Sequence, residues 1–174
     1  MVMTRIRRWA AFVSITFAAA MLVPAATATA ATPDKGAVEV FPYQGSADCS
    51  PYGFTFDNNV KGQESFWVQT FFDTHGNPVK QVTHDSFSET DTNSVSGKTL
   101  RLSGKRVETL DFVLNTRTDV GIDFIMIDPG TGAVILDVGR VVFDAPFHVS
   151  FEAGPHPVLH GDIDQLACTA LAAA

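Results

Sequence analysis

The sequence predicts an all-β protein, either an antiparallel β-barrel of about eight strands or a curved sandwich, with a short C-terminal α-helix. Three observations lead to this prediction. Apolar and polar residues alternate with a period of two through much of the chain between residues 37 and 152. Turn-forming residues separate these segments at short intervals, and an alanine-rich segment with a helix-start signal follows the last of them.

The first 30 residues have the pattern of a secretory signal peptide. Arg5, Arg7 and Arg8 precede an apolar run that is shorter than the about 20 residues of a membrane-spanning helix. Ala28 and Ala30 then supply the small residues of an A-x-A exit. We therefore expect cleavage after Ala30, a secreted, extracellular protein and no membrane association after cleavage. A retained membrane anchor is the alternative.

After this cleavage, residues 31–48 would form a partly extended N-terminal segment and residues 49–174 a single β domain. Loss of the three signal-peptide arginines leaves nine basic residues against 19 acidic ones, a net charge of −10. A chain this acidic is expected to repel nucleic acid and anionic lipid. Both a monomer and a homodimer remain open.

Cys49 and Cys168 are the two cysteines of the chain. Export would expose them to an oxidising environment, and two cysteines allow only one intramolecular pairing. We predict a Cys49–Cys168 disulfide that closes a loop of more than a hundred residues, with two free thiols as the alternative.

The strand prediction depends on residues that share one face. Tyr52, Phe54 and Phe56 lie on one face of the first segment, and Phe66, Val68 and Phe72 on one face of the next. Residues 98–104, 106–115 and 147–152 alternate in the same way. Turns are predicted at residues 74–78, 96–98, 103–105, 128–132 and 144–146.

Two segments depart from the simple alternation. Residues 121–144 form a predicted hairpin whose arms are apolar on both faces, so that the C-terminal helix, another sheet layer or a second subunit must cover the outer face. Residues 79–94 are mostly polar, and we interpret them as an edge strand or as a hairpin arm exposed to solvent.

The predicted helix spans residues 162–173. Asp162 is a suitable N-cap, and Gln165 three residues later completes a capping-box pattern.

Three residues before and at this helix start are the candidate metal ligands, namely His156, His160 and Asp162. The two histidines have the i, i+4 spacing of a helical metal pair, but Pro155 and Pro157 flank His156 and exclude a regular helix there. A rigid strand-to-helix corner with two partly exposed histidines explains the same residues, and we expect no metal.

Catalytic motifs are scarce. The sequence has no nucleophile elbow, dinucleotide fingerprint or phosphate loop, so no cofactor is expected. An enzyme on a small barrel, cyclase-like or hydrolytic, would need polar groups that converge inside it. The candidates for such a site are His84, Asp111, Asp123 and Arg140.

Aromatic residues are more abundant, with 14 phenylalanines in the chain. Most would fill a core, but an open barrel could bind a small apolar ligand. The candidate lining residues are Phe54, Phe56, Phe66, Phe112 and Phe124. The favoured function is therefore a non-enzymatic binding protein for a small apolar ligand or a cell-envelope partner. The alternatives are the small-barrel enzyme and a protein-interaction domain that uses the hairpin 121–144.

The C-terminal residues 129–171 contain the stretches "LDVGRVVFD" and "GPHPVLHGD", followed by a leucine and a cysteine in the tail. This pattern resembles one found in uncharacterised small secreted actinobacterial proteins. The resemblance covers about a quarter of the chain. It implies an exported all-β domain and supplies no catalytic residues.

Overall fold

A computed structural model describes residues 33–144 and 148–173 of the chain. The predicted signal peptide, residues 1–30, lies outside the described residues, as does Phe147. Eight strands form one sheet, in which every neighbouring pair is antiparallel. The strands are β1 (Asp34–Lys35), β2 (Glu39–Asp48), β3 (Asp57–Phe72), β4 (Pro78–Asn93), β5 (Thr99–Asp111), β6 (Thr116–Asp128), β7 (Gly132–Asp144) and β8 (His148–Ala153).

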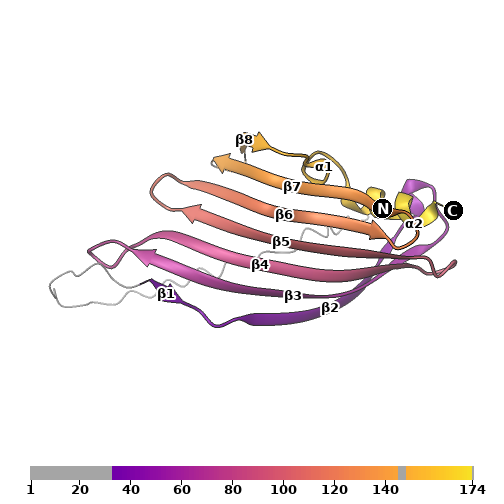
Figure 1. Cartoon of the computed structure of the whole chain (residues 1–174), viewed down its shortest axis with the longest axis horizontal. Helices are drawn as coiled ribbons and strands as arrows, with labels where there is room; N and C mark the ends of the chain where they lie inside the picture. The colour runs from indigo at the N-terminus through magenta and orange to yellow at the C-terminus, as the bar shows by residue number, and fades with distance from the viewer. Residues whose placement is uncertain (1–32, 145–147, 174) are drawn as a thin grey trace, which may run out of the picture.

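The sheet is a meander that stays open. From β3 to β8 each strand pairs with the next along the chain, and β1 and β2 both pair with the other edge of β3 (Figure 1). In the described part of the chain, β2 and β8 are not paired with each other, so the sheet does not close. This confirms the all-β antiparallel fold and, of the two expected architectures, fits the curved sandwich. The segment 31–48, expected to be partly extended, contributes β1 and the ten-residue edge strand β2.

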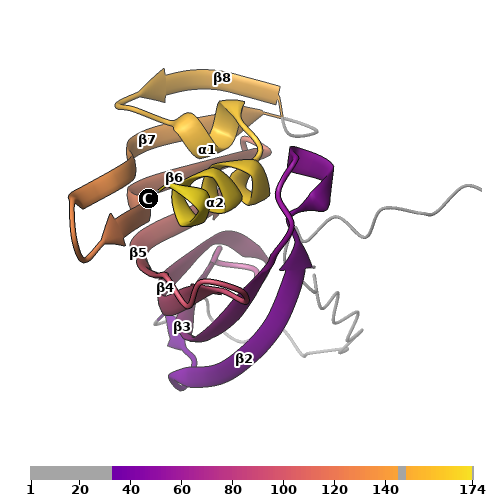
Figure 2. The same ribbon diagram turned by 90° about the vertical axis from the view of Figure 1, so that its right-hand side faces the viewer.

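Three short helices accompany the sheet: the 3₁₀ turn η1 (Ser50–Tyr52), α1 (Pro157–His160) and α2 (Ile163–Ala172). Helix α2 lies against the concave side of the sheet (Figure 2). Its N-cap is the predicted one, because the Asp162 carboxylate accepts the backbone N–H groups of Asp164 and Gln165. Among the described residues, no helix is long and apolar enough to cross a membrane.

The hydrophobic core lies between α2 and the strands β5, β6 and β7. Leu100, Leu102, Phe124, Met126 and Ile135 point from the sheet toward Ala167, Ala170 and Leu171 of the helix, and all eight are buried. A single sheet has no interior of its own, so this helix supplies the second layer that the core needs.

A disulfide joins Cys49 to Cys168, as the sequence predicted, and both residues are fully buried. Cys49 immediately precedes η1, and Cys168 lies in the middle of α2. The bridge therefore fastens the covering helix to the segment that links β2 to β3.

Strand β4 is not an edge strand, which corrects one of the two interpretations of residues 79–94. It pairs with β3 along one side and with β5 along the other. Its buried polar residues have partners on neighbouring strands: Asn58 of β3 donates a hydrogen bond to Asp91, and Asp85 pairs with Arg106 of β5. Polar composition here reflects a polar interior, not exposure to solvent.

Three predicted local structures were wrong. Residues 52–56 do not belong to a strand, because Tyr52 ends the 3₁₀ turn η1 and β3 begins only at Asp57. Residues 103–105 form no turn but continue β5, because Gly104 provides room: a Cβ atom there would lie 2.3 Å from Cε1 of Phe87 and 2.6 Å from the carbonyl oxygen of Asp123. The chain instead turns at residues 112–115, where a strand was expected. The Asp111 carboxylate accepts the backbone N–H groups of Val113 and Leu114, and this favours the turn over continued pairing.

The disulfide should be a major source of stability. Its cysteines are 119 residues apart, so the chain-entropy model gives a loss of about 5 kcal/mol in the free energy of unfolding when the bridge is removed. Chemical denaturation of the Cys49→Ser/Cys168→Ser variant measures this loss. The variant Ser46→Ala, which removes an exposed side-chain hydrogen bond of β2 to Asn59, serves as control and should change the value little. A loss below about 1 kcal/mol in the double variant would contradict the expectation.

Candidate functional site

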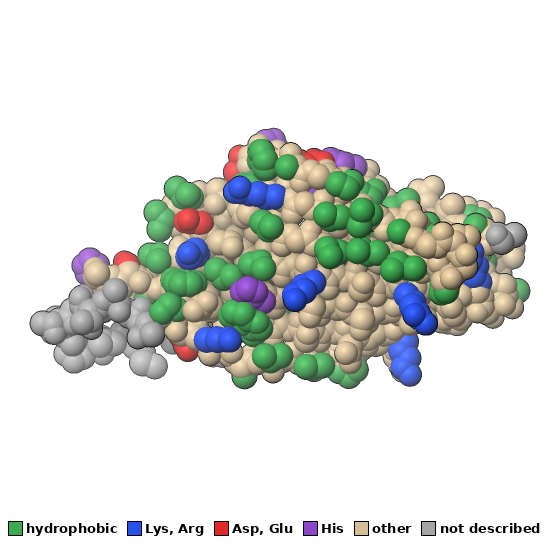
Figure 3. Space-filling model, viewed as in Figure 1, with side chains coloured by type: hydrophobic (Ala, Val, Ile, Leu, Met, Phe, Trp, Pro, Cys, Tyr) green, Lys and Arg blue, Asp and Glu red, His purple; other side chains and the backbone are tan. Residues whose placement is uncertain are grey.

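The most distinctive surface of the molecule is an aliphatic area on the convex face of the sheet, opposite α2 (Figure 3). It is formed by the exposed side chains of Val120 (46% exposed), Ile122 (37%), Ile127 (39%), Val134 (45%) and Leu136 (45%). We call these five residues the convex surface. Contiguous apolar areas on a protein's exterior are typical of sites that bind another molecule.

The sequence places this surface through the two-faced hairpin of β6 and β7. Ile125 pairs with Leu136 and Ile122 with Val138 across the hairpin, so their side chains share one face. The intervening residues Phe124 and Ile135 face the other way and are buried in the core. Helix α2 therefore covers one apolar face of the hairpin, and in the described part of the chain the other face stays exposed.

Cations flank the convex surface on both sides. On β5, Arg101 pairs with Ile127 and Lys105 with Ile122. On β7, Arg140 pairs with Val120, and its guanidinium lies 5.6 Å from the ring centre of Phe151, an exposed residue of β8. The convex surface is thus a strip of aliphatic side chains between basic ones.

The concave face carries the opposite charge. Arg106 Nε lies 3.1 Å from Asp85 Oδ2 and Arg106 Nη1 lies 2.7 Å from Asp123 Oδ1. Asp123 is the extra residue of a β-bulge in β6, since Ile122 and Phe124 oppose the consecutive residues Val138 and Asp137. Burial raises the pKa of Asp85 and of the neighbouring Glu64, and the negative charge of Asp85 raises the pKa of Glu64 further.

A second ion cluster follows along the same face. Arg117 Nε lies 2.9 Å from Glu108 Oε2, and Arg117 Nη2 lies 2.6 Å from Asp119 Oδ2. Burial raises the pKa of Glu108 although Arg117 opposes the shift. The interior of the curved sheet is therefore largely polar and internally paired beyond the end that α2 covers.

The four polar-site candidates do not come together. His84 stacks on Trp67, with the ring centres 3.9 Å apart, and Arg140 lies beside Val120; both are on the convex face. Asp123 faces Arg106 on the concave side, while Asp111 caps the turn at residues 112–115. The structure thus places these residues on two faces and at one end of the sheet.

The five candidate ligand-lining phenylalanines are also separated. Phe124 packs against Phe87 in the core, and Phe66 stacks on Phe41 of β2. Phe112 is exposed in the turn after β5. Only Phe54 and Phe56 are neighbours, with their ring centres 5.6 Å apart.

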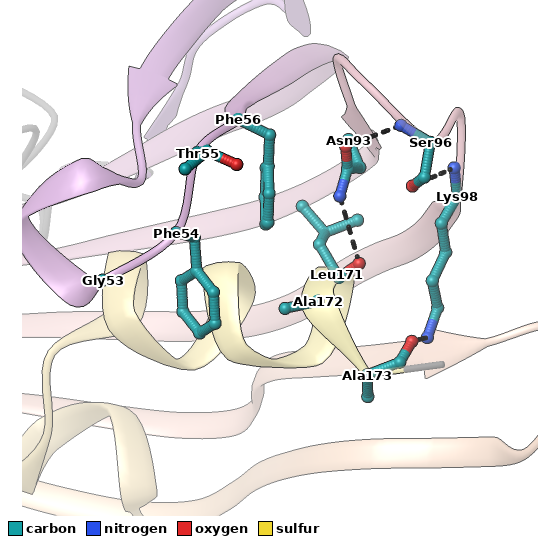
Figure 4. Close-up of a pocket in the computed structure, with 10 residues that line it drawn as sticks. All are labelled: Gly53, Phe54, Thr55, Phe56, Asn93, Ser96, Lys98, Leu171, Ala172 and Ala173. Carbon is teal, nitrogen blue, oxygen red and sulfur yellow. Dashed lines mark hydrogen bonds between the residues drawn. The ribbon is translucent and has the colours of Figure 1, made fainter.

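Phe54 and Phe56 line a pocket of about 480 Å³ beside the C-terminal end of α2 (Figure 4). Two of its polar side chains bind carbonyl groups at the end of α2: Asn93 Nδ2 donates to the Leu171 carbonyl at 3.3 Å, and Lys98 Nζ donates to the Ala173 carbonyl at 2.6 Å. These bonds satisfy carbonyl groups that the end of a helix leaves free. The pocket wall is completed by Gly53, Thr55, Ser96 and Ala172.

The candidate metal ligands have other partners. Asp162 caps α2 and accepts a hydrogen bond from the Tyr52 hydroxyl, and His160 Nε2 lies 2.9 Å from the Glu152 carboxylate. His156 is buried, in contrast to the partly exposed histidines expected, and its Nδ1 lies 2.8 Å from Asp137 Oδ1. Among the described residues, no group of three or more metal-ligating side chains converges.

The buried pair of His156 and Asp137 holds the corner between β8 and α1 against β7. Asp137 also accepts the backbone N–H of Val158 at 2.8 Å, and His156 Nε2 lies 3.2 Å from the Ala153 carbonyl oxygen. Both ring nitrogens thus face acceptors, so both donate when the ring is protonated. Burial opposes the charge, but the hydrogen bonds to Asp137 and Ala153 outweigh it and raise the pKa of His156.

Sequence reasoning missed Asp137, Arg106 and Arg117 as residues that organise the molecule. A signal was present for Asp137, because an acid inside the apolar arm "AVILDVG" requires a buried partner. Arg106 and Arg117 gave no comparable signal, since a basic residue in a strand usually lies on its exposed face.

The raised pKa of His156 predicts a pH dependence of stability. The group stabilises the fold fully below its unfolded pKa of about 6.5, and this contribution is lost as the pH rises through the higher folded value. The melting temperature should therefore fall as the pH rises above about 6.5 and through the higher pKa of the folded state. His156→Gln should lower the free energy of unfolding by about 3 kcal/mol near pH 6, because it leaves the buried Asp137 without a cationic partner, and should reduce the pH dependence.

The control for this experiment is His148→Gln, which removes an exposed histidine paired with Asp144. It should change the free energy of unfolding by less than about 1 kcal/mol. Equal losses in the two variants, or an unchanged pH dependence in His156→Gln, would contradict the assigned role.

Comparison with protein-family models, with curated proteins and with solved structures finds no match for this chain. The resemblance to small secreted actinobacterial proteins stays a prediction.

Proposed function

We propose that this protein is an exported, non-enzymatic binding protein that docks onto a component of the cell envelope through the convex surface. The observation that carries the proposal is the exposure of Val120, Ile122, Ile127, Val134 and Leu136 side by side on a regular sheet face. Exposing this strip to water is unfavourable, and a partner that covers it would recover roughly 25 cal/mol for each Å² buried.

The rigidity of the site supports the same proposal. The convex surface lies on paired strands and not on a loop, and the core behind it fixes the positions of both arms of the hairpin. The convex surface is therefore preorganised, and this protein loses little conformational entropy when a partner binds. The small-barrel enzyme has less support, because its four candidate residues lie apart.

A small apolar ligand is a second candidate for the bound molecule, and the pocket beside Phe54 and Phe56 favours it. A volume of about 480 Å³ falls within the usual range of small-molecule sites.

Docking predicts that the purified protein sediments with envelope fractions of the producing cells. The variant Val120→Thr/Ile122→Thr/Leu136→Thr keeps β-branched or short side chains suited to strands but makes the convex surface polar, so its envelope affinity should fall at least about tenfold. Sedimentation with quantified bound and free protein measures the change.

The matched control is Val113→Thr/Leu114→Thr, which alters two side chains that are at least as exposed but lie in the turn at residues 112–115. It should bind as the unaltered protein does. The proposal would be contradicted if the variant Val120→Thr/Ile122→Thr/Leu136→Thr bound envelopes as well as the unaltered protein while circular dichroism showed that both are folded.

The ligand alternative predicts a bound small molecule in native mass spectra of protein purified from the culture medium. Ala172→Trp should displace it, because the indole would occupy the pocket beside Phe54. If the spectra of the unaltered protein showed only the mass of the polypeptide, this would count against a bound ligand.

A further inference from the structure

We infer that the envelope component bound by the convex surface is an anionic lipid surface. The inference rests on the proposed docking function and names its partner by two properties of the convex face. The face combines exposed aliphatic side chains with basic ones, and the carboxylates in the interior of the same strands lie on the opposite face.

The pleat of the sheet separates the charges. Arg101 and Lys105 of β5 and Arg140 of β7 share the convex face with the aliphatic strip. The carboxylates in the interior of β5, β6 and β7 point to the other side, where they pair with arginine or histidine: Glu108, Asp119, Asp123 and Asp137. An acidic chain thus presents a basic face, visible in Figure 3 as blue side chains around the green strip.

Because the charges are separated in this way, we expect the convex face to attract anionic lipid although the chain as a whole is acidic. Net charge predicts repulsion for the chain as a whole, but charges beyond a Debye length of about 8 Å are largely screened at physiological ionic strength. A lipid surface in contact with the convex face therefore interacts chiefly with Arg101, Lys105 and Arg140 and much less with the paired carboxylates behind the sheet.

A second copy of the chain fits the convex face poorly. Two convex faces placed together would bring the same three cations against one another, and like charges in contact are repelled. A convex face placed against a concave one would meet α2 at one end, and carboxylates already paired with Arg106 and Arg117 farther along.

An acidic protein partner is also less suited to this surface than lipid. Protein interfaces depend on central Trp, Tyr and Arg anchors, and Lys is depleted in them. The centre of the convex surface is instead Val, Ile and Leu, and the sheet has already paired its backbone N–H and C=O groups. An anionic lipid surface is bound by aliphatic side chains that enter the acyl boundary and by cations at the level of the headgroups. This binding needs no directional hydrogen bonds.

The test uses vesicles of phosphatidylcholine with and without phosphatidylglycerol. The unaltered protein should sediment with the phosphatidylglycerol vesicles and not with phosphatidylcholine alone, and binding should weaken as salt is added. Each basic residue near an anionic surface contributes about fivefold in affinity, so Arg101→Gln/Lys105→Gln/Arg140→Gln should lose more than about a hundredfold.

Lys98→Gln is the matched control, because it removes one cation on the side of α2, where the Lys98 ammonium lies 3.0 Å from Asp128 Oδ2 and 2.6 Å from the Ala173 carbonyl oxygen. It should lose less than about fivefold, and the threonine variant of the convex surface should lose binding as the glutamine variant does.

The outcomes separate this inference from the proposed function. Sedimentation with envelopes but not with phosphatidylglycerol vesicles would overturn the lipid inference and leave the docking function standing; loss of envelope binding after protease treatment would then identify a protein partner. Sedimentation with neither would overturn both. A dimer in light scattering that the threonine variant converts to a monomer would also overturn both, since the strip would then be buried between copies.

Discussion

The packing of α2 into the concave side of the sheet is the contact on which the rest of the molecule depends. Without the helix, Leu100, Leu102, Phe124, Met126 and Ile135 would have no apolar partner on that side. The disulfide between Cys49 and Cys168, the Asp162 cap and the bonds from Asn93 and Lys98 to the last carbonyls all hold this helix in place. Both of its ends and its middle are thus secured independently.

The pleat then determines the character of each face. On β6 and β7 it sends one set of aliphatic side chains into the core and an equivalent set to the convex side. On β3, β4 and β5 it sends Glu64, Asp85 and Arg106 into the curved interior. The concave side is therefore apolar under α2 and polar beyond it, and the convex side of β6 and β7 carries exposed aliphatic side chains with Arg101, Lys105 and Arg140 around them.

Much of the fold could be predicted from the sequence. Period-two alternation identified the strands, the hairpin 121–144 and the absence of long helices between them, and Asp162 with Gln165 located the start of α2. The errors came from residues whose environment is set by distant partners. Gly104 resembles a turn glycine but provides space for Phe87, and the polar strand β4 is central because its acids meet Asn58 and Arg106.

The candidate site was predictable only in part. Because both faces of the hairpin 121–144 are apolar, the sequence indicated that another element would pack on one of them. It did not indicate that α2 would cover the inner face and that the outer face would stay exposed. The sequence alone did not show that basic and acidic side chains would lie on opposite faces of the sheet, because this separation depends on the register of three strands and on the bulge at Asp123. His156 is hydrogen-bonded to Asp137, which lies 19 residues away in the sequence, and the local spacing of residues does not reveal such a contact.

The position of α2 in the chain has a consequence for biogenesis. The helix follows all eight strands in the sequence, so a nascent polypeptide contains the whole meander before its second layer exists. Until Ile163–Ala172 emerges, both faces of β6 and β7 are apolar and uncovered, a condition that invites aggregation or capture by a chaperone. Completion of the native state therefore has to wait until this helix has been synthesised.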